Sequence, residues 1–228
     1  MTLSVIIPTF NEADTIRQVI QDVFAYAQSQ PPEVVVVDAG STDGTPALAR
    51  QAGATVLTAT TPGRAAQMNH GARHTTGQVL YFVHADVRLH PDFLPDIQHA
   101  TEAGAQAGRY RFRFNSDRAM LRINSYSTRF GGALSRGGDQ TLFITRTLFE
   151  RLGGFNERFV IMEDFDLIRR IEQHTPLTVI PKEVVVSARK YEQNSWLRVQ
   201  LANLAAVALF SCQVSPARIA RAYRAMLH

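Results

Sequence analysis

The chain has 228 residues, 45% of them hydrophobic and 19% charged, with a formal net charge of +4. This length and composition suit one large domain, or one domain with a small appendage, and exclude a disordered or fibrous protein. The single cysteine, Cys212, excludes an internal disulfide framework and indicates a reducing, cytoplasmic compartment.

The first half of the chain alternates apolar runs with helical patterns. Residues 3–8 form a β-branched run, followed by the helical pattern NEADTIRQVIQDVFAYAQS, which Asn11 is expected to cap. EVVVVD predicts a second strand, TPALARQAG a helix, ATVLTAT a third strand, GRAAQMNHGARHTTG a helix and QVLYFVHAD a fourth strand. The alternation predicts an α/β fold: a Rossmann-like, mostly parallel sheet with helices on both faces.

The second half is less regular. DFLPDIQHATEAG predicts a helix, QTLFITRTLFERLGGF a strand and then a helix, and the pattern after Val160 a helix that starts near Asp164. The run AGRYRFRF alternates as a half-exposed strand should, with aromatic residues on one face and Arg109, Arg111 and Arg113 on the other. We expect one domain over residues 1–194, with a nucleotide-binding half (1–90) and an acceptor-side half (91–194), then a helical tail over 195–228.

Polar residues collect where the predicted parallel strands end. These residues are Thr9, Asn11 and Glu12 after the first strand, Asp38 after the second, and His84 and Asp86 after the fourth. Ligands of open parallel sheets bind beyond this edge. G-x-G-x-x-G after the first strand and G-x-x-x-x-G-K-[ST] are both missing, which argues against dinucleotide-binding Rossmann enzymes and P-loop NTPases.

Each of these polar residues has a chemical and a structural interpretation. Asp38 could accept hydrogen bonds from a uracil-type base or from ribose hydroxyls, or it could simply build the turn DAGSTDGT. Asp86 could bind a divalent cation whose other ligands are diphosphate oxygens and water. His84 is a metal ligand, a phosphate contact or part of the strand end. Arg64 starts a helix, where it binds phosphate or stays exposed.

VIMEDFDLIRR places Glu163, Asp164 and Asp166 within four positions at a predicted helix start. Favourable interaction with the helix dipole explains one or two of these acids. A base that removes a proton from a hydroxyl must be a carboxylate or a histidine. Asp164 sits at the junction of loop and helix, so it is a candidate for that base.

Together these stretches resemble the family 2 glycosyltransferases with the GT-A fold. SVIIPTFNE, VVVVDAGSTDGT, GRAAQMNHGA, VLYFVHADVRL and GGFNERFVIMEDFDLIRR occur in the order and at the spacing of that family. GRAAQMNHGA, GGDQ and MEDFDL are also similar to a bacterial subgroup of radical-SAM/selenodomain-associated transferases.

The resemblance implies roles for individual residues. Those implied to bind the nucleotide sugar are Pro8, Thr9, Glu12, Asp38, Gly40, Arg64, His84, Ala85 and Asp86. Asp86 matches the metal-binding acid of the family's D-x-D motif and would bind Mn²⁺ or Mg²⁺, whereas His84 replaces the acid that usually contacts ribose. Asp164 matches the catalytic base, and Glu163 would support it.

The implied reaction moves a sugar from a UDP- or GDP-type donor to an acceptor hydroxyl, on a lipid or a saccharide, with inversion at the anomeric carbon. Arg136, Asp139 and Gln140 are expected on the acceptor side, in an arginine-rich segment whose alternative role is a solvated basic face. Arg189 is expected to close over the diphosphate.

The tail contains the apolar stretch WLRVQLANLAAVALFSC, interrupted by polar residues and too short to cross a bilayer. It predicts either an interfacial helix at the inner membrane face or a packing helix, within the domain or in a homodimer. Met1 leads into TLSVIIPTF without a basic leader, so we predict no signal peptide.

Three other functions compete with the transferase. A non-catalytic sugar-nucleotide binding protein would bind the donor without transfer. A nucleotidyltransferase would be expected to have a glycine-rich loop where this chain has PTFNE. A nucleic-acid binder would use the arginines but leave the strand-end acids unexplained, so no nucleic-acid partner is predicted.

Overall fold

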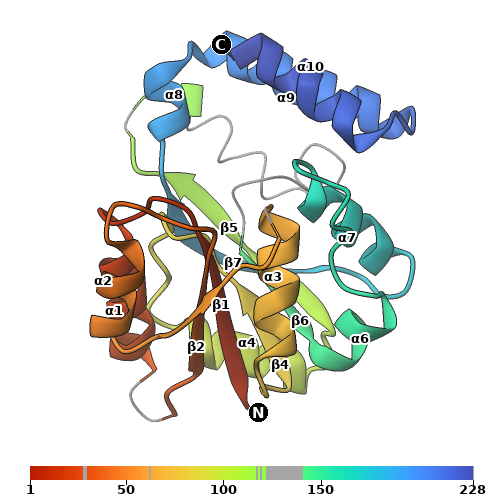
Figure 1. Ribbon diagram of the computed structural model, residues 1–228. Coiled ribbons are helices and arrows are strands. Elements are labelled where there is room, and N and C mark those ends of the chain that lie inside the picture. The colour runs from red at the N-terminus through yellow and green to blue at the C-terminus, as the bar shows by residue number, and fades with distance from the viewer. Residues whose placement is uncertain (28–29, 62, 117, 119, 122–140, 228) are drawn as a thin grey trace.

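The structure, a computed structural model, describes residues 1–27, 30–61, 63–116, 118, 120–121 and 141–227. Its centre is a seven-stranded sheet with the strand order β3-β2-β1-β4-β6-β5-β7 (Figure 1). The strands are β1 (Leu3–Thr9), β2 (Glu33–Asp38), β3 (Thr55–Thr58), β4 (Val79–Phe82), β5 (Ala107–Phe114), β6 (Leu142–Thr145) and β7 (Thr178–Val186). All neighbouring pairs are parallel except the two that involve β6, which confirms the mostly parallel sheet.

Helices cover both faces of this sheet, as predicted. They are α1 (Ile16–Tyr26), α2 (Thr45–Gln51), α3 (Arg64–Arg73), α4 (Phe93–Glu102), α6 (Arg146–Arg151), α7 (Glu163–Glu172), α8 (Arg189–Gln193), α9 (Trp196–Ser211) and α10 (Pro216–Leu227). Side chains alternate along β1: Val5 and Ile7 pack in one hydrophobic core with α1 and α4, whereas Ile6 packs in a second core with α3, α6 and α7. This two-sided burial explains why the parallel strands read as continuous apolar runs.

The strand order places the predicted site residues at one edge. β1 lies between β2 and β4, so the order reverses there and a crevice is expected beyond the strand ends. In the β1–β2 register Thr9 is opposite Asp38, and in the β1–β4 register Ile6 is opposite Phe82, two residues before His84. The polar ends of β1, β2 and β4 therefore share the carboxyl edge of the sheet.

Of two expectations about helix starts, one is wrong and one is confirmed. Helix α1 begins at Ile16 with Thr15 as its N-cap residue, so Asn11 does not cap it. Asn11 has a φ of 54° and connects two loops, because its side-chain oxygen accepts a hydrogen bond from the Thr42 N–H at 3.0 Å. Helix α7 begins at Glu163, which confirms the start predicted near Asp164, and Glu163 belongs to its first turn.

The expectation that β5 exposes all its arginines is also wrong. Arg109 is only 2% exposed, whereas Arg113 is exposed, and Tyr110 and Phe112 are buried as predicted. Sequence alternation cannot reveal that helices cover the arginine face near the start of β5. Desolvation lowers the pKa of Arg109 to about 10, and the charge of Glu172 on α7 acts in the opposite direction.

Helices α9 and α10 form a hairpin that lies over the carboxyl edge of the sheet, at the top of Figure 1. Val199 of α9 is buried in the core that contains α1, and the ring of Phe210 packs against Phe159 and Phe165 beside α7. Within the described residues, no helix is long and apolar enough to cross a bilayer. The hairpin is thus attached to the body of the protein by both of its ends.

Close packing of α3 on the sheet gives a test of this fold. A Cβ atom at Gly71 would lie 2.5 Å from Cγ2 of Ile6 and 3.1 Å from Cγ2 of Val37. We expect Gly71→Ala to push α3 outward and lower the free energy of unfolding by about 1–3 kcal/mol, measured by urea denaturation. Arg73→Ala is the control, because this side chain on the same helix is 60% exposed. An equal or smaller loss in Gly71→Ala than in the control would contradict the packing.

Candidate functional site

Asp38 organises the loop that follows β2. Its Oδ1 accepts hydrogen bonds from the hydroxyls of Thr9 at 3.0 Å and Ser41 at 2.5 Å, and its Oδ2 from the N–H groups of Gly40 at 3.0 Å and Ser41 at 2.8 Å. Gly40 has a φ of +88°, a conformation in which glycine is strongly preferred. The carboxylate is buried, and these four bonds use its ordinary acceptor capacity. The turn-building role of Asp38 is present, and its contact with a base stays a prediction.

Gln67 on α3 forms hydrogen bonds with the same carboxyl edge of the sheet. Its side-chain Nε2 donates hydrogen bonds to the backbone oxygens of Thr9, at 2.9 Å, and Val37, at 2.8 Å. Gln67 is buried, so these bonds satisfy strand-end carbonyls that water cannot reach. Gln67 is not among the site residues predicted from the sequence, although a glutamine among small residues in GRAAQMNHGA is a signal for such a contact.

Arg189, at the start of α8, bridges two of the predicted site acids. Its Nη2 lies 3.1 Å from each carboxylate oxygen of Glu12 and 3.8 Å from Oδ2 of Asp86. The hydrogen bond to Glu12, followed by the charges of Glu12 and Asp86, raises the pKa of Arg189 against its desolvation. A residue more than 170 positions from Glu12 therefore supplies a positive charge beside both acids at the carboxyl edge of the sheet.

A second ion pair brings α7 to the same edge. Nε of Arg64, at the start of α3, lies 2.7 Å from Oε1 of Glu163, at the start of α7. Glu163 is 1% exposed and Asp164 is 9% exposed, so both of these adjacent acids face the interior. The preceding residue, Met162, has a φ of 67°, an uncommon conformation for a residue other than glycine. Such strain is concentrated at functional sites, where the surrounding structure maintains it.

His84 lies within the electrostatic influence of the Arg64 guanidinium. Desolvation and then the positive charge of Arg64 lower the pKa of His84 far below the usual value for histidine. Its imidazole is therefore neutral at physiological pH and keeps a lone pair that can bind a metal. Asp86, two residues later, has a side chain that is 30% exposed and therefore accessible to a ligand. A carboxylate with a neutral imidazole fits Mn²⁺, and the carboxylate alone fits Mg²⁺.

The remaining predicted contacts are placed as follows. Pro8 lies within β1, and Ala85 is a buried residue between His84 and Asp86. The predicted acceptor-side residues Arg136, Asp139 and Gln140 lie outside the described residues, so their role stays a prediction.

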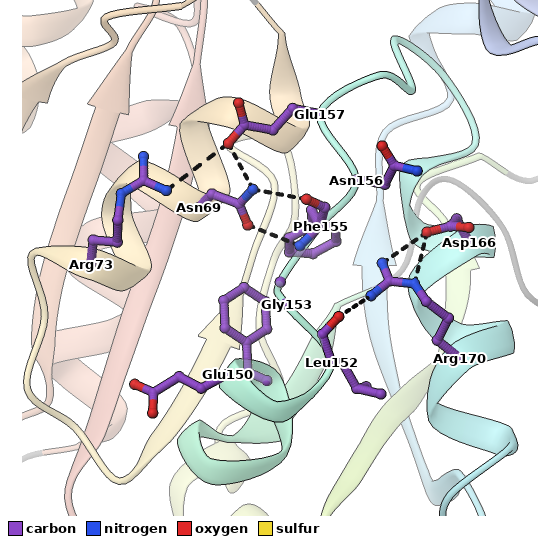
Figure 2. A pocket seen from close by; sticks show the side chains of 12 residues that line it. Asn69, Arg73, Glu150, Leu152, Gly153, Phe155, Asn156, Glu157, Asp166 and Arg170 are labelled. Atoms are coloured by element: carbon purple, nitrogen blue, oxygen red, sulfur yellow. Dashed lines mark hydrogen bonds and ion pairs between the residues drawn. The ribbon is translucent and has the colours of Figure 1, made fainter.

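A groove of about 710 Å³ opens on another side of α3, between α3, α6 and α7 (Figure 2). Asn69 lines one wall of this groove and pairs with the backbone of Phe155. Its Nδ2 donates to the oxygen of Phe155 and its Oδ1 accepts from the N–H of Phe155, both at 2.9 Å. The same Nδ2 donates to Glu157 at 2.8 Å. A Cβ at Gly154 would lie 2.6 Å from Oδ1 of Asn69, so this close approach requires glycine.

Arg170 forms the opposite wall of this groove. Its Nε and Nη2 lie 2.9 Å and 2.8 Å from Oδ2 of Asp166, and its Nη1 donates to the backbone oxygen of Leu152 at 2.8 Å (Figure 2). Asp166 and Arg170 therefore fix the end of α6 to α7. Asp166, the third acid of VIMEDFDLIRR, has Arg170 as a structural partner and lies apart from the ion pair between Arg64 and Glu163.

A cluster of one histidine and two aspartates lies at the start of α4. Ligand-type atoms of His90, Asp92 and Asp96 lie within 4.8 Å of one another. Nζ of Lys182 lies 2.8 Å from Asp92 and 2.7 Å from Asp96, and its hydrogen bond lowers the pKa of Asp92. The ammonium group thus already supplies the positive charge of this cluster.

The fold is the GT-A fold of solved glycosyltransferases. Glucosyl-3-phosphoglycerate synthase from Mycobacterium tuberculosis, in complex with Mn²⁺ and UDP, superposes with a TM-score of 0.65 at 21% identity, over 93% of this chain and 80% of that chain. The mannosyltransferase PcManGT from Pyrobaculum calidifontis, in complex with GDP-Man and Mn²⁺, superposes with a TM-score of 0.68 at 22% identity, over 99% and 68% of the two chains.

Sequence comparison gives the family. Residues 4–160 match Glycosyl transferase family 2, and the chain belongs to this family. It is 31% identical over 103 residues to the M. tuberculosis glucosyl-3-phosphoglycerate synthase, covering 41% of this chain and about a third (32%) of that relative. It is 35% identical over 184 residues to glycosyltransferase AglE from Haloferax volcanii, covering 74% of this chain and 60% of that protein.

The pairing of Asn69 with Phe155 gives a test of the site's framework. We expect Asn69→Ala to leave the N–H and oxygen of Phe155 buried without partners and to lower the free energy of unfolding by about 2 kcal/mol or more. Asn156→Ala in the same groove is the matched control, because the side chain of Asn156 accepts an exposed hydrogen bond from the Arg158 N–H, at 3.2 Å. Equal stability losses in the two variants, measured by urea denaturation, would show that Asn69 does not carry this connection.

Proposed function

We propose that the protein transfers a sugar from a nucleoside diphosphate sugar to an acceptor hydroxyl, with Asp164 as the base. The observation that carries this proposal is the ion pair of 2.7 Å between Arg64 and Glu163. It brings the acidic start of α7 to the strand edge where Arg64 also acts on the pKa of His84. This ion pair supports a shared site in which Asp86 acts on the phosphate side and Asp164 is the separate base that direct displacement requires.

The donor is assigned to the ends of β1, β2 and β4. The base and ribose lie beside Thr9, Glu12 and the Asp38 loop, and the diphosphate lies beside Arg64 and Asp86. The two solved structures of the same fold contain UDP and GDP-Man, which supports a UDP- or GDP-type donor. The Asp38 carboxylate acts mainly by fixing the loop, so its Gly40 and Ser41 backbone presents a rigid wall to the nucleotide.

The reaction is a single displacement. The acceptor oxygen forms a bond to the anomeric carbon while the bond from that carbon to the diphosphate oxygen breaks, and its electron pair leaves with the nucleoside diphosphate. Asp164 accepts the proton of the hydroxyl, and the anomeric centre inverts. Mn²⁺ or Mg²⁺ bound by Asp86, with His84 as a neutral neighbour, would supply Lewis-acid stabilisation of the departing diphosphate. Glu163 positions Asp164 through its ion pair with Arg64.

The acceptor is a hydroxyl of a lipid or a saccharide, and Arg136, Asp139 and Gln140 are assigned to its side of the site. The proposed domain spans residues 1–194, with the nucleotide-binding half at 1–90 and the acceptor-side half at 91–194, followed by the tail at 195–228. The motifs GRAAQMNHGA, GGDQ and MEDFDL support membership of the radical-SAM/selenodomain-associated subgroup. The single cysteine, Cys212, supports a cytoplasmic location.

The base is tested by Asp164→Asn. We expect release of nucleoside diphosphate from UDP-glucose or GDP-mannose to fall by about 10²–10⁴-fold, because general-base assistance is lost. Donor binding, measured by calorimetry with Mn²⁺, should remain within about threefold, because Asp164 does not contact the donor in this arrangement. Wild-type turnover by the variant would remove Asp164 from the mechanism. A wild-type protein that binds donor but neither transfers nor hydrolyses it would instead be a non-catalytic binding protein.

Arg189 is proposed to exchange its partners when the donor binds. It contacts Glu12 and Asp86 in the structure, so an incoming diphosphate and metal would release the guanidinium to pair with phosphate oxygens. We expect Arg189→Ala to weaken UDP or GDP binding with Mn²⁺ by about tenfold, since charge-assisted hydrogen bonds contribute about 1.5–3 kcal/mol. Arg198→Ala, an exposed arginine of α9, is the matched control and should bind like the wild type. Unchanged affinity in Arg189→Ala would refute this role.

A further inference from the structure

The hairpin of α9 and α10 has an unusual charge composition. Residues 195–228 contain no aspartate or glutamate, and their charged residues are Arg198, Arg218, Arg221 and Arg224. The hairpin therefore has a formal charge of +4, equal to that of the whole chain. The charges of the other 194 residues cancel, so the net positive charge of the protein is located on this element.

Helix α9 exposes a line of leucines. Leu197, Leu201 and Leu204 are 61%, 50% and 58% exposed. Their spacing of four and three residues puts them on one side of the helix. Val199 and Ala202 are fully buried on the side that packs against the body, so the leucines point away from it. Isolated exposed leucines are ordinary, but an aligned set on one helix marks an interaction surface.

Helix α10 exposes a line of arginines in the same way. Arg218, Arg221 and Arg224 repeat every three residues and are exposed, whereas Ile219 and Ala220 are buried. The two helices are held side by side by a hydrogen bond of 3.0 Å from Tyr223 of α10 to Asn203 of α9. The solvent-exposed surface of the hairpin therefore carries a leucine line on α9 and an arginine line on α10.

We infer that this surface docks the protein on a bilayer that contains anionic lipids. In interfacial helices, exposed apolar side chains enter the boundary between headgroups and acyl chains, and basic side chains pair with anionic headgroups. The leucines and arginines of the hairpin fit these two roles. A second copy of the chain is a poor occupant, because a symmetric contact would bring two acid-free, positively charged surfaces together. Helix α9 has 16 residues, about 24 Å, so it lies on a bilayer and does not cross it.

Further exposed apolar side chains lie at the same edge of the molecule. Phe10, which directly follows β1, is 60% exposed, and Val160, shortly before α7, is 45% exposed. The guanidinium of Arg169 on α7 lies 5.2 Å from the centre of the Phe210 ring on α9, which fixes the hairpin beside α7. Docking of the hairpin would therefore hold the carboxyl edge of the sheet near the lipid surface (Figure 1). The inference concerns the surface alone and does not depend on the proposed reaction.

The test uses the full chain and vesicles of phosphatidylcholine with or without about 30% phosphatidylglycerol. We expect flotation with the anionic vesicles, weakened by high salt because Debye screening shortens the range of the arginine charges. The chain's single cysteine, the exposed Cys212 at the end of α9, accepts an environment-sensitive fluorophore that should shift to shorter wavelength on binding. A label on Ala103→Cys in a Cys212→Ser background should not shift, because Ala103 ends α4 at the opposite edge, close to Met1.

Two surface variants separate the leucine and arginine contributions. Leu201→Gln/Leu204→Gln and Arg218→Gln/Arg221→Gln/Arg224→Gln should each weaken partitioning into anionic vesicles by about tenfold or more. Arg17→Gln/Arg50→Gln/Arg151→Gln removes the same charge from exposed arginines of other elements and should have a much smaller effect. Circular dichroism checks that each variant is folded.

Three outcomes would overturn the inference. The first is a folded wild-type protein that does not float with anionic vesicles. The second is an equal loss of vesicle binding in the control variant and in the variant of the α10 arginine line, which would mean that only the net charge matters. The third is a stable dimer, seen by analytical ultracentrifugation, that the leucine variant dissociates while vesicle binding is unchanged.

Discussion

The ion pair between Arg64 and Glu163 is the interaction on which the arrangement of the site depends. It connects the start of α3, from the first half of the chain, to the start of α7, almost one hundred residues later. A buried carboxylate such as that of Glu163 is costly without a partner, so the pair strongly favours one relative position of the two helices. Burial and, after it, the charge of the same guanidinium lower the pKa of His84. One cation thus holds the acidic helix start and adds to the effect of burial on the pKa of the neighbouring imidazole.

The sequence was sufficient to predict the sheet, its two covered faces and the shared edge of Thr9, Asp38 and Asp86. Those predictions rest on continuous apolar runs and on the rule that parallel strands end together, both of which are local signals. Arg109 shows the limit of such signals, because alternation within β5 does not reveal which helix later covers its outer face. Asn11 shows another, because its partner Thr42 comes from a loop that is distant in sequence.

The family motifs contain residues that stabilise the site without facing a ligand. In GRAAQMNHGA, Gln67 binds strand-end carbonyls, Asn69 pairs with the backbone of Phe155, and Gly71 allows α3 to approach the sheet. In VIMEDFDLIRR, Asp166 and Arg170 fix α6 to α7. Sequence reasoning identifies such motifs readily, but it cannot divide them between chemistry and scaffold, because both uses demand polar side chains at fixed spacings.

Arg189, Lys190 and Tyr191 are consecutive in the chain but engage three different parts of the molecule. Arg189 contacts the pocket acids, Lys190 contacts Tyr223 of α10, and Tyr191 is buried in the core. Where the chain is cut therefore decides what a truncation measures. A deletion that starts before Arg189 would remove the pocket guanidinium together with the hairpin, and inactivity would have two causes. A deletion that starts at Ser195 would retain the guanidinium and isolate the contribution of α9 and α10.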